Sequence, residues 1–265
     1  MQSPFLDRIN LDSLAQDYWE FSSCNQKDPV VFFEENPIGL ASIDKFEEEW
    51  MNSVGAIISP GASGRVLDVG AGDGRLARLL RNRGLEVSCL EPSSYFAGLL
   101  KADGFDVIEQ KWLDWDSKDD FDTLVFNRSF IVCAADRGKI RLHDSIQRLI
   151  QYSPSNGFVV FPPIERIVNP GALESFLFAG GLAKPLYTPA MYAFFELGLF
   201  PQIRFLSMEE KKEYRSLHDC LEKDFKCIPH NELLRAFIQK SFFTEGNRLI
   251  RPRNMITMIL SWSHL

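Results

Sequence analysis

The sequence lacks the paired cysteines of a disulfide-stapled protein. Its five cysteines are odd in number and scattered, and no two form a C-x-x-C pair, which is typical of a reducing compartment. Residues 1–10 contain neither a basic start followed by an apolar run nor a small-residue cleavage site, so no secretory signal is expected. These absences predict a cytoplasmic protein that folds without disulfides.

A long uninterrupted apolar run is also missing. The most apolar stretch covers residues 185–203, where Glu196 is the only charged residue and Pro185, Pro189 and Pro201 interrupt the chain. A membrane-spanning helix needs about 20 residues of sustained apolar helix. We therefore expect this stretch to be buried structure or the wall of an apolar pocket, and we expect no membrane partner.

Clustered positive charge is scarce too. The formal net charge is −7, and no Lys/Arg cluster is longer than the Lys211–Lys212 pair. Such a molecule repels polyanions, so nucleic acid is not expected as a substrate. The acidic balance favours a small-molecule substrate, although a peptide stays open, and the sequence leaves the oligomeric state unknown.

A zinc site is suggested by two short patterns but is not expected. His218 and Cys220 are two positions apart, and Cys227 and His230 are three apart. The first pair lies on a predicted charged helix, where positions i and i+2 point in different directions rather than toward one metal. We predict no metal.

Short apolar runs alternate with helical patterns from Gly64 onward. In a chain of 265 residues with 45% hydrophobic content, this alternation predicts one doubly wound α/β domain with a mostly parallel sheet. The expected strands are 65–69, 86–90, 106–109, 121–126 and 157–161, and the expected helices are 74–83, 94–102 and 139–152.

The flanking segments complete the expected domain plan. An amphipathic helix is predicted over residues 43–58, inside an N-terminal helical cap of residues 1–60. Residues 61–265 form the core domain, with helical insertions after the fifth and sixth strands at about 162–200 and 207–245. Two further strands bring the sheet to seven, and the last is antiparallel. A helix is expected from Thr188 and Pro189 to about Gly198, followed by an edge strand at 201–206. The capping-box spacing of Ser207 to Glu210 predicts the start of a charged helix that ends near Lys223. A helix at 231–242 and a final strand at 255–262 complete the chain.

The segment VLDVGAGDGRLARLL carries the clearest functional signal. An apolar strand runs into Gly70, Gly72 and Gly74, and a helical pattern follows at once. Glycines let the chain turn sharply and let a ligand approach the backbone. The next strand ends at Glu91, 19 positions after Gly72, where a carboxylate can accept hydrogen bonds from both hydroxyls of a ribose. The pattern predicts an adenosine-cofactor site.

Dinucleotide enzymes use the related pattern G-x-G-x-x-G. Here the third glycine comes one position early, and Arg75 stands where the backbone would have to approach a pyrophosphate. This difference disfavours NAD.

The strand, the D-x-G-x-G-x-G turn and the acidic end of the second strand resemble the class I S-adenosylmethionine (SAM) dependent methyltransferases. Asp68, Gly70, Gly72 and Gly74 match the first motif of that family. The resemblance implies SAM as the cofactor, with the methionine end facing the backbone from Gly70 through Ala71 to Gly72. It also implies that Glu91 holds the ribose and that Pro92, the next residue, belongs to the cofactor site.

The resemblance extends along the core to about Phe161. Trp112 and Leu113 stand where the family places residues beside adenine, often with an acidic side chain at the position of Trp112. An indole could instead cover the adenine face while the Leu113 backbone meets its edge. Residues 121–129 resemble the fourth-strand motif, whose end lies under the transferred methyl group. Asn127 is thus expected at the cofactor, and Asn127, Arg128 and Ser129 are the candidates for catalysis.

The sequence names no general base and no methyl acceptor. Asn-Arg-Ser replaces the Asn/Asp-Pro-Pro-aromatic motif of methyltransferases that act on adenine or glutamine amino groups, so those substrates are not favoured. Arg128 either grips an anionic substrate or is a solvated strand-end charge. Methyl transfer to an O, N or C acceptor is the expected activity. The alternatives are an NAD(P)-dependent oxidoreductase and a non-catalytic SAM-binding module.

Overall fold

A computed structural model describes most of the 265-residue chain. The described residues are 45–116, 121–136, 139–152, 155–166, 190, 193–195, 197–224, 243–245 and 248–263. The chain divides into two compact units. Unit 1 comprises Met1–Pro162, Leu186–Leu206 and Met258–Leu265, and unit 2 comprises Pro163–Pro185 and Ser207–Thr257.

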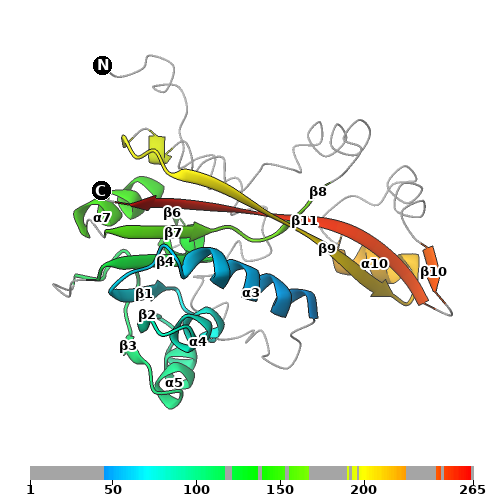
Figure 1. The fold of residues 1–265 in the computed structure, drawn as a ribbon, viewed down its shortest axis with the longest axis horizontal. Coiled ribbons are helices and arrows are strands. Elements are labelled where there is room, and N and C mark those ends of the chain that lie inside the picture. Colours follow the sequence, from blue (N-terminus) through cyan, green and yellow to red (C-terminus); the bar gives the residue numbers. More distant parts are fainter. Residues whose placement is uncertain are drawn as a thin grey trace. The chain divides into compact units, whose positions relative to one another are not determined.

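A twisted sheet runs through unit 1 and is parallel except at one edge (Figure 1). Its parallel strands stand in the order β3-β2-β1-β4-β7, and β11 follows β7 in the antiparallel sense. The bounds are β1 Arg65–Val69, β2 Glu86–Leu90, β3 Asp106–Ile108, β4 Thr123–Asn127, β7 Asn156–Val160 and β11 Arg248–Ser263. The predicted fold class, a mostly parallel α/β sheet with an antiparallel last strand, is confirmed.

Helices lie in the connections from β1 to β2, from β2 to β3 and from β4 to β7, and one further helix precedes β1, because parallel neighbours need a crossover connection. Their bounds are α3 Lys45–Ile58, α4 Arg75–Asn82, α5 Ser94–Ala102, α6 Phe130–Cys133 and α7 Leu142–Tyr152. The start of α5 is capped by the Ser93 hydroxyl, which accepts a hydrogen bond from the Phe96 N–H. None of the described helices is long and apolar enough to cross a membrane.

Several predicted elements coincide with the observed ones. The bounds of β1, β2 and α5 are those predicted, and β3, β4, β7 and α4 differ by one or two residues at an end. The predicted helix at 139–152 begins later, at Leu142, because Lys139–Ile140 forms a short strand, β6, that pairs with β5 (Ala135–Asp136). The helix expected to end near Gly198 is seen at residue 190 and at 193–195. Its start at Thr188 and Pro189 lies outside the described residues.

The predicted charged helix from Ser207 to Lys223 is wrong in its first half. Residues Gln202–Tyr214 form one strand, β9, and the helix α10 covers only Leu217–Asp224. Along the second half of β9 the less exposed residues recur at every second position, ending at the buried Glu210 and Tyr214. The burial of every second side chain is the pattern of a strand paired with a neighbour, and this pairing outweighed the capping-box spacing that had predicted a helix.

The sheet has nine strands rather than the predicted seven among the described residues. The two additional strands are β8 (Ile164–Arg166) and β10 (Phe243–Glu245), and both pair antiparallel with β11. β11 is longer than the predicted 255–262. Within unit 2, Glu210 on β9 forms a buried ion pair with Arg253 on β11. The predicted helix at 231–242 lies outside the described residues, and the 60/61 domain boundary stays a prediction.

The core of unit 1 lies between the sheet and its helices. Buried aliphatic side chains of β1, β4 and β7 pack with a group of aromatic rings. Trp115 stacks on Tyr152 at a centroid distance of 4.5 Å, and Trp112 meets Phe126 edge-on at 5.1 Å. This packed layer fixes the ends of the strands from which the site is built.

Candidate functional site

A pocket of about 520 Å³ lies at the carboxyl ends of the parallel strands. β1 is flanked by β2 on one side and β4 on the other, so the chain winds away from it in both directions. Such a switch point leaves a crevice between the loops that follow the two central strands. The pocket is lined by Glu47, Met51, Gly70, Ala71, Gly72, Asp73, Arg75, Leu76, Leu90, Glu91, Pro92, Ser93, Phe96, Gln110, Lys111, Trp112, Asn127, Arg128, Ser129, Val132, Cys133 and Ala135.

The glycine turn after β1 has a backbone that only glycine adopts easily. Gly70, Gly72 and Gly74 have φ values of 69°, 55° and 77°. A Cβ on Gly70 would lie 2.7 Å from the Ser129 Cβ, whereas one on Gly72 would meet nothing within 4 Å. Gly70 is therefore required by packing, and Gly72 leaves open space at the pocket wall.

Glu91 ties the glycine turn to the end of β2. One carboxylate oxygen accepts a hydrogen bond from the Gly72 N–H at 2.7 Å, and the other accepts one from the Ser93 N–H at 2.9 Å. The side chain is buried and lines the pocket. Each carboxylate oxygen has the lone pairs to accept more than one hydrogen bond, so Glu91 holds the turn in place at the wall of the pocket.

Asp68 lies beneath the turn, and it is not among the residues that line the pocket. Burial, together with the negative charges of Glu91 and Asp73, raises the pKa of its carboxyl to about 7. The Ala77 N–H, in the first turn of α4, donates to this carboxyl. Its Oδ1 has no hydrogen-bond partner within the described part of the chain. Asp68 therefore serves as an internal cap for α4 and adds negative potential to this side of the pocket.

The three candidate catalytic residues lie at the end of β4, with Asn127 its last residue and Arg128 and Ser129 directly after it, and all three line the pocket. The Ser129 hydroxyl donates to the Val69 carbonyl at 2.5 Å, so it joins β4 to β1. The Asn127 amide nitrogen lies 3.8 Å from the Met51 sulfur, while its buried Oδ1 has no partner among the described residues. Buried polar atoms normally have a hydrogen-bond partner. The Asn127 Oδ1 is therefore a candidate acceptor for a hydrogen bond from a ligand.

Arg128 has an unusual backbone conformation. It is the only non-glycine residue with positive φ, 59°, within the described ranges. Its N–H donates to the Val160 carbonyl at 2.8 Å, and its guanidinium lies 4.8 Å from the centre of the Trp50 ring. Left-handed backbone costs about 1–2 kcal/mol and is retained mostly at functional sites. Arg128 is held in place, so it is not a freely solvated charge.

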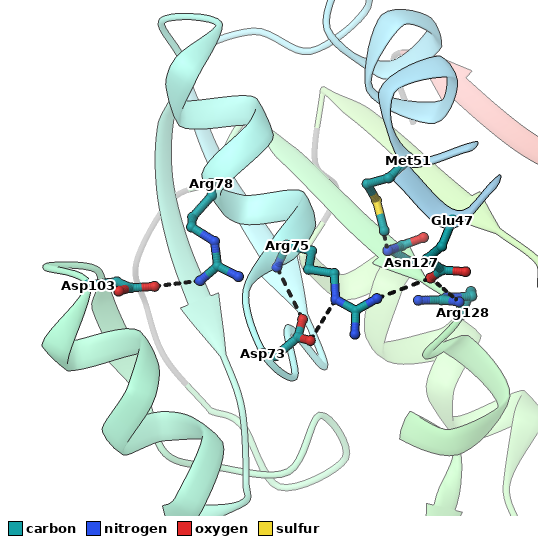
Figure 2. A network of polar contacts seen from close by, with 8 residues as sticks. All are labelled: Glu47, Met51, Asp73, Arg75, Arg78, Asp103, Asn127 and Arg128. Atoms are coloured by element: carbon teal, nitrogen blue, oxygen red, sulfur yellow. Dashed lines mark hydrogen bonds and ion pairs between the residues drawn. The ribbon is translucent and has the colours of Figure 1, made fainter. Parts of the chain in front are cut away.

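Glu47 brings two arginines together at the rim of the glycine turn (Figure 2). Its Oε1 lies 2.8 Å from Arg128 Nη1 and 3.3 Å from Arg75 Nη1. Arg75 also pairs with Asp73 at 2.7 Å. Sequence reasoning missed Glu47 as a pocket residue, because it lies on α3, far from the motif, and no local pattern marked it.

The residues expected beside adenine are only partly at the pocket. Pro92 and Trp112 line it, and Leu113 does not. The Trp112 indole is almost fully buried, and its N–H donates to the Ser145 hydroxyl at 2.9 Å. Its ring is thus part of the core as well as of the wall, and its proposed contact with adenine stays a prediction. Gln110 and Lys111 also line the pocket, and Gln110 was not predicted there.

The zinc patterns gain no support from the described residues. No group of three or more histidine, cysteine, aspartate or glutamate side chains in that part of the chain could hold a metal ion. Cys227 and His230 lie outside the described residues.

Comparison with solved structures gives SAM-dependent methyltransferases. One is an enzyme from Archaeoglobus fulgidus (14% identity, 88% of this chain and 98% of that chain, TM-score 0.47). A second is the N-methyltransferase NodS from Bradyrhizobium japonicum, solved with S-adenosylhomocysteine (SAH) (10% identity, 90% of this chain and 99% of that chain, TM-score 0.47). A third is geranyl diphosphate C-methyltransferase from Streptomyces coelicolor, solved with Mg²⁺, geranyl diphosphate and SAH (14% identity, 97% of this chain and 100% of that chain, TM-score 0.47).

No protein-family model matches the sequence, and no curated protein matches it either. The identities to these three solved structures are at most 14% and each TM-score is 0.47, so the likeness assigns no function to this chain.

Proposed function

We propose that this chain is a SAM-dependent methyltransferase that acts on a small molecule. The observation that carries the proposal is the bond between Glu91 and Gly72 at the carboxyl ends of β1 and β2. It sets an acidic side chain for a ribose beside an open glycine turn for an amino-acid moiety. A pocket of about 520 Å³ falls in the usual range for small ligands, roughly 300–1,000 Å³.

The charges around the turn favour SAM over a dinucleotide. Asp68, Asp73 and Glu91 surround the start of α4, and their mutual repulsion contributes to the raised pKa of Asp68. The Arg75 and Ala77 N–H groups, which a pyrophosphate would use, already point at the Asp73 and Asp68 carboxylates. A pyrophosphate would find both N–H groups already engaged and the Asp73 and Glu91 carboxylates beside them, so a phosphate is disfavoured at the start of α4. An NAD(P)-dependent oxidoreductase is therefore the weaker alternative.

The residues present fit SAM at four places. Glu91 would accept from the ribose hydroxyls, and the open wall at Gly72 would admit the methionine moiety. Pro92 and Trp112 would flank the adenine, and Asn127 Oδ1 would accept from a donor on the cofactor or the acceptor. SAM supplies the activated methyl group when it is bound, so the chain itself has to align the acceptor and exclude water.

Asn127, Arg128 and Ser129 are the residues proposed to align the acceptor. Asn127 ends β4 and the other two follow it, and hydrogen bonds from Ser129 to Val69 and from Arg128 to Val160 fix this end of the strand. Ser129 keeps acceptor capacity on its oxygen, because its proton is engaged with Val69. The proposed acceptor atom is an oxygen, a nitrogen or a carbon. The scattered cysteines favour a cytoplasmic location.

Thermal unfolding with SAM, SAH and NAD tests this proposal. We expect SAM and SAH to raise the melting temperature of the protein and NAD to leave it unchanged, because only ligands that bind the native state stabilise it. Stabilisation by NAD alone would contradict the proposal. Binding of SAH without methyl transfer to any of a panel of small nucleophiles would instead favour the non-catalytic module.

A further inference from the structure

One carboxylate oxygen is shared by two guanidinium groups at the pocket. Glu47 Oε1 is the atom that faces both Arg75 Nη1 at 3.3 Å and Arg128 Nη1 at 2.8 Å (Figure 2). All three side chains line the pocket, and between 17% and 33% of each is exposed. Two arginines converging on one carboxylate have the donor set that binds an anionic ligand group.

The position of Arg128 does not depend on a ligand. Its backbone N–H donates to the Val160 carbonyl, and its guanidinium has a cation–π contact with the Trp50 ring at 4.8 Å. Glu47 is the only carboxylate that pairs with Arg128 within the described ranges. Arg75, in contrast, keeps Asp73 as a second partner. Removing Glu47 would thus leave Arg128 with no paired carboxylate among the described residues, and a ligand carboxylate in the pocket would be attracted there.

The opposing carboxylate comes from a separate helix. Glu47 lies in the first turn of α3, and Met51, one turn further along, contacts Asn127. The pocket wall on this side is therefore made by side chains of α3 rather than by the sheet or its loops. A side chain in this place can give way to a ligand without any change in the glycine turn or in β4.

We propose that Arg75 and Arg128 form a carboxylate-binding subsite, which Glu47 fills in the absence of ligand and which a ligand carboxylate fills in the complex. The inference rests on the proposed methyltransferase function. The carboxylate has two possible sources: the methionine end of SAM, or an acidic methyl acceptor.

Calorimetric titrations of the full chain distinguish the two sources. SAM is compared with decarboxylated SAM, which lacks only the carboxylate, and benzoate is titrated into protein saturated with SAH. The variants are Arg128→Gln and Glu47→Gln. Their matched controls are Arg78→Gln, whose guanidinium pairs with Asp103 away from the pocket (Figure 2), and Glu48→Gln, the exposed neighbour of Glu47.

If the carboxylate belongs to SAM, Arg128→Gln weakens SAM binding about tenfold or more and leaves decarboxylated SAM unchanged. If it belongs to the acceptor, Arg128→Gln leaves SAM binding unchanged and weakens benzoate binding by a similar factor. In either case Glu47→Gln strengthens binding of the same carboxylate ligand, because a competitor is removed. A purely structural role for Glu47 would instead make that variant bind more weakly.

The outcomes also separate this inference from the proposed function. A wild-type protein that binds neither SAM nor SAH would contradict the methyltransferase proposal. The carboxylate subsite alone would be overturned by a different result. In that result the wild-type protein binds SAM, and Arg128→Gln and Glu47→Gln have the same affinities for SAM and for benzoate as the two control variants.

Discussion

The two sides of the pocket are built in different ways. The glycine-turn side is fixed by backbone N–H groups, which donate from Gly70 to the Leu90 carbonyl and from Gly72 to the Glu91 carboxylate, and the buried carboxyls of Asp68 and Glu91 lie on this side. The α3 side is held by side-chain contacts of Glu47 with Arg75 and Arg128. We call the first side the rigid half, which is proposed to bind an adenosine ligand, and the second the adjustable half, which is proposed to respond to ligand charge.

The rigid half is broken most severely at Gly70. Replacing Gly70 by Ala adds a Cβ 2.7 Å from the Ser129 Cβ and 2.9 Å from the Cys133 Sγ, at a φ of 69°. Overpacking and left-handed strain together should lower the free energy of unfolding by about 4 kcal/mol. Denaturant titration measures this loss.

Gly72→Ala is the matched control for that change. Its φ is also positive, but the added Cβ meets nothing within 4 Å, so we expect a loss of only about 1 kcal/mol. Equal losses for the two variants would mean that Gly70 is not packed against the turn after β4.

The ligand contact of the rigid half is tested at Glu91. Glu91→Ala should weaken SAH binding about 100-fold, because charge-assisted hydrogen bonds to the ribose are lost and the Gly72 N–H loses its acceptor. Calorimetric titration measures the dissociation constant. Glu109→Ala, an exposed carboxylate paired with Lys101, is the control and should bind SAH as the wild type does. Unchanged affinity for Glu91→Ala would show that the ribose contact is misassigned.

The acidity of the rigid half makes its stability depend on pH. In the folded state the pKa of Asp68 is raised from 3.8 to about 7. The folded state therefore binds this proton more tightly than the unfolded state, and stability falls as pH rises through this window. Linkage gives a loss of about 2 kcal/mol between pH 5 and pH 7.

Asp68→Asn cannot ionise and should lose the part of the pH dependence that Asp68 contributes. Its amide oxygen can still accept from the Ala77 N–H. Unfolding curves at pH 5, 6 and 7 for both proteins measure the difference, and parallel curves would exclude Asp68 as its origin.

The same contrast explains what could be predicted from the sequence. The strand, the glycine turn, α4 and Glu91 are encoded within 27 consecutive residues, 65–91, and local pattern was enough to find them. Glu47, Arg75 and Arg128 meet only because α3 packs beside the turn, and no local pattern marks a contact of that kind. The adjustable half therefore required the folded structure.

The wrong prediction of a helix from Ser207 also has a cause in a contact between residues far apart in the sequence. Ser207 and Glu210 have the spacing of a helix cap, but Glu210 pairs with Arg253 on β11, and Tyr214 is buried in the same strand. Pairing with a distant strand outweighed a local propensity. At Gly70 and Glu91, in contrast, the local sequence pattern and the contacts with distant parts of the chain favour the same structure.

A crystal structure of the protein with bound SAH tests the central claim most directly. The account predicts that both ribose hydroxyls lie within about 3 Å of the Glu91 carboxylate and that the homocysteine moiety crosses the open wall at Gly72. SAH bound away from Glu91, or an adenosine whose ribose makes no contact with it, would contradict the account.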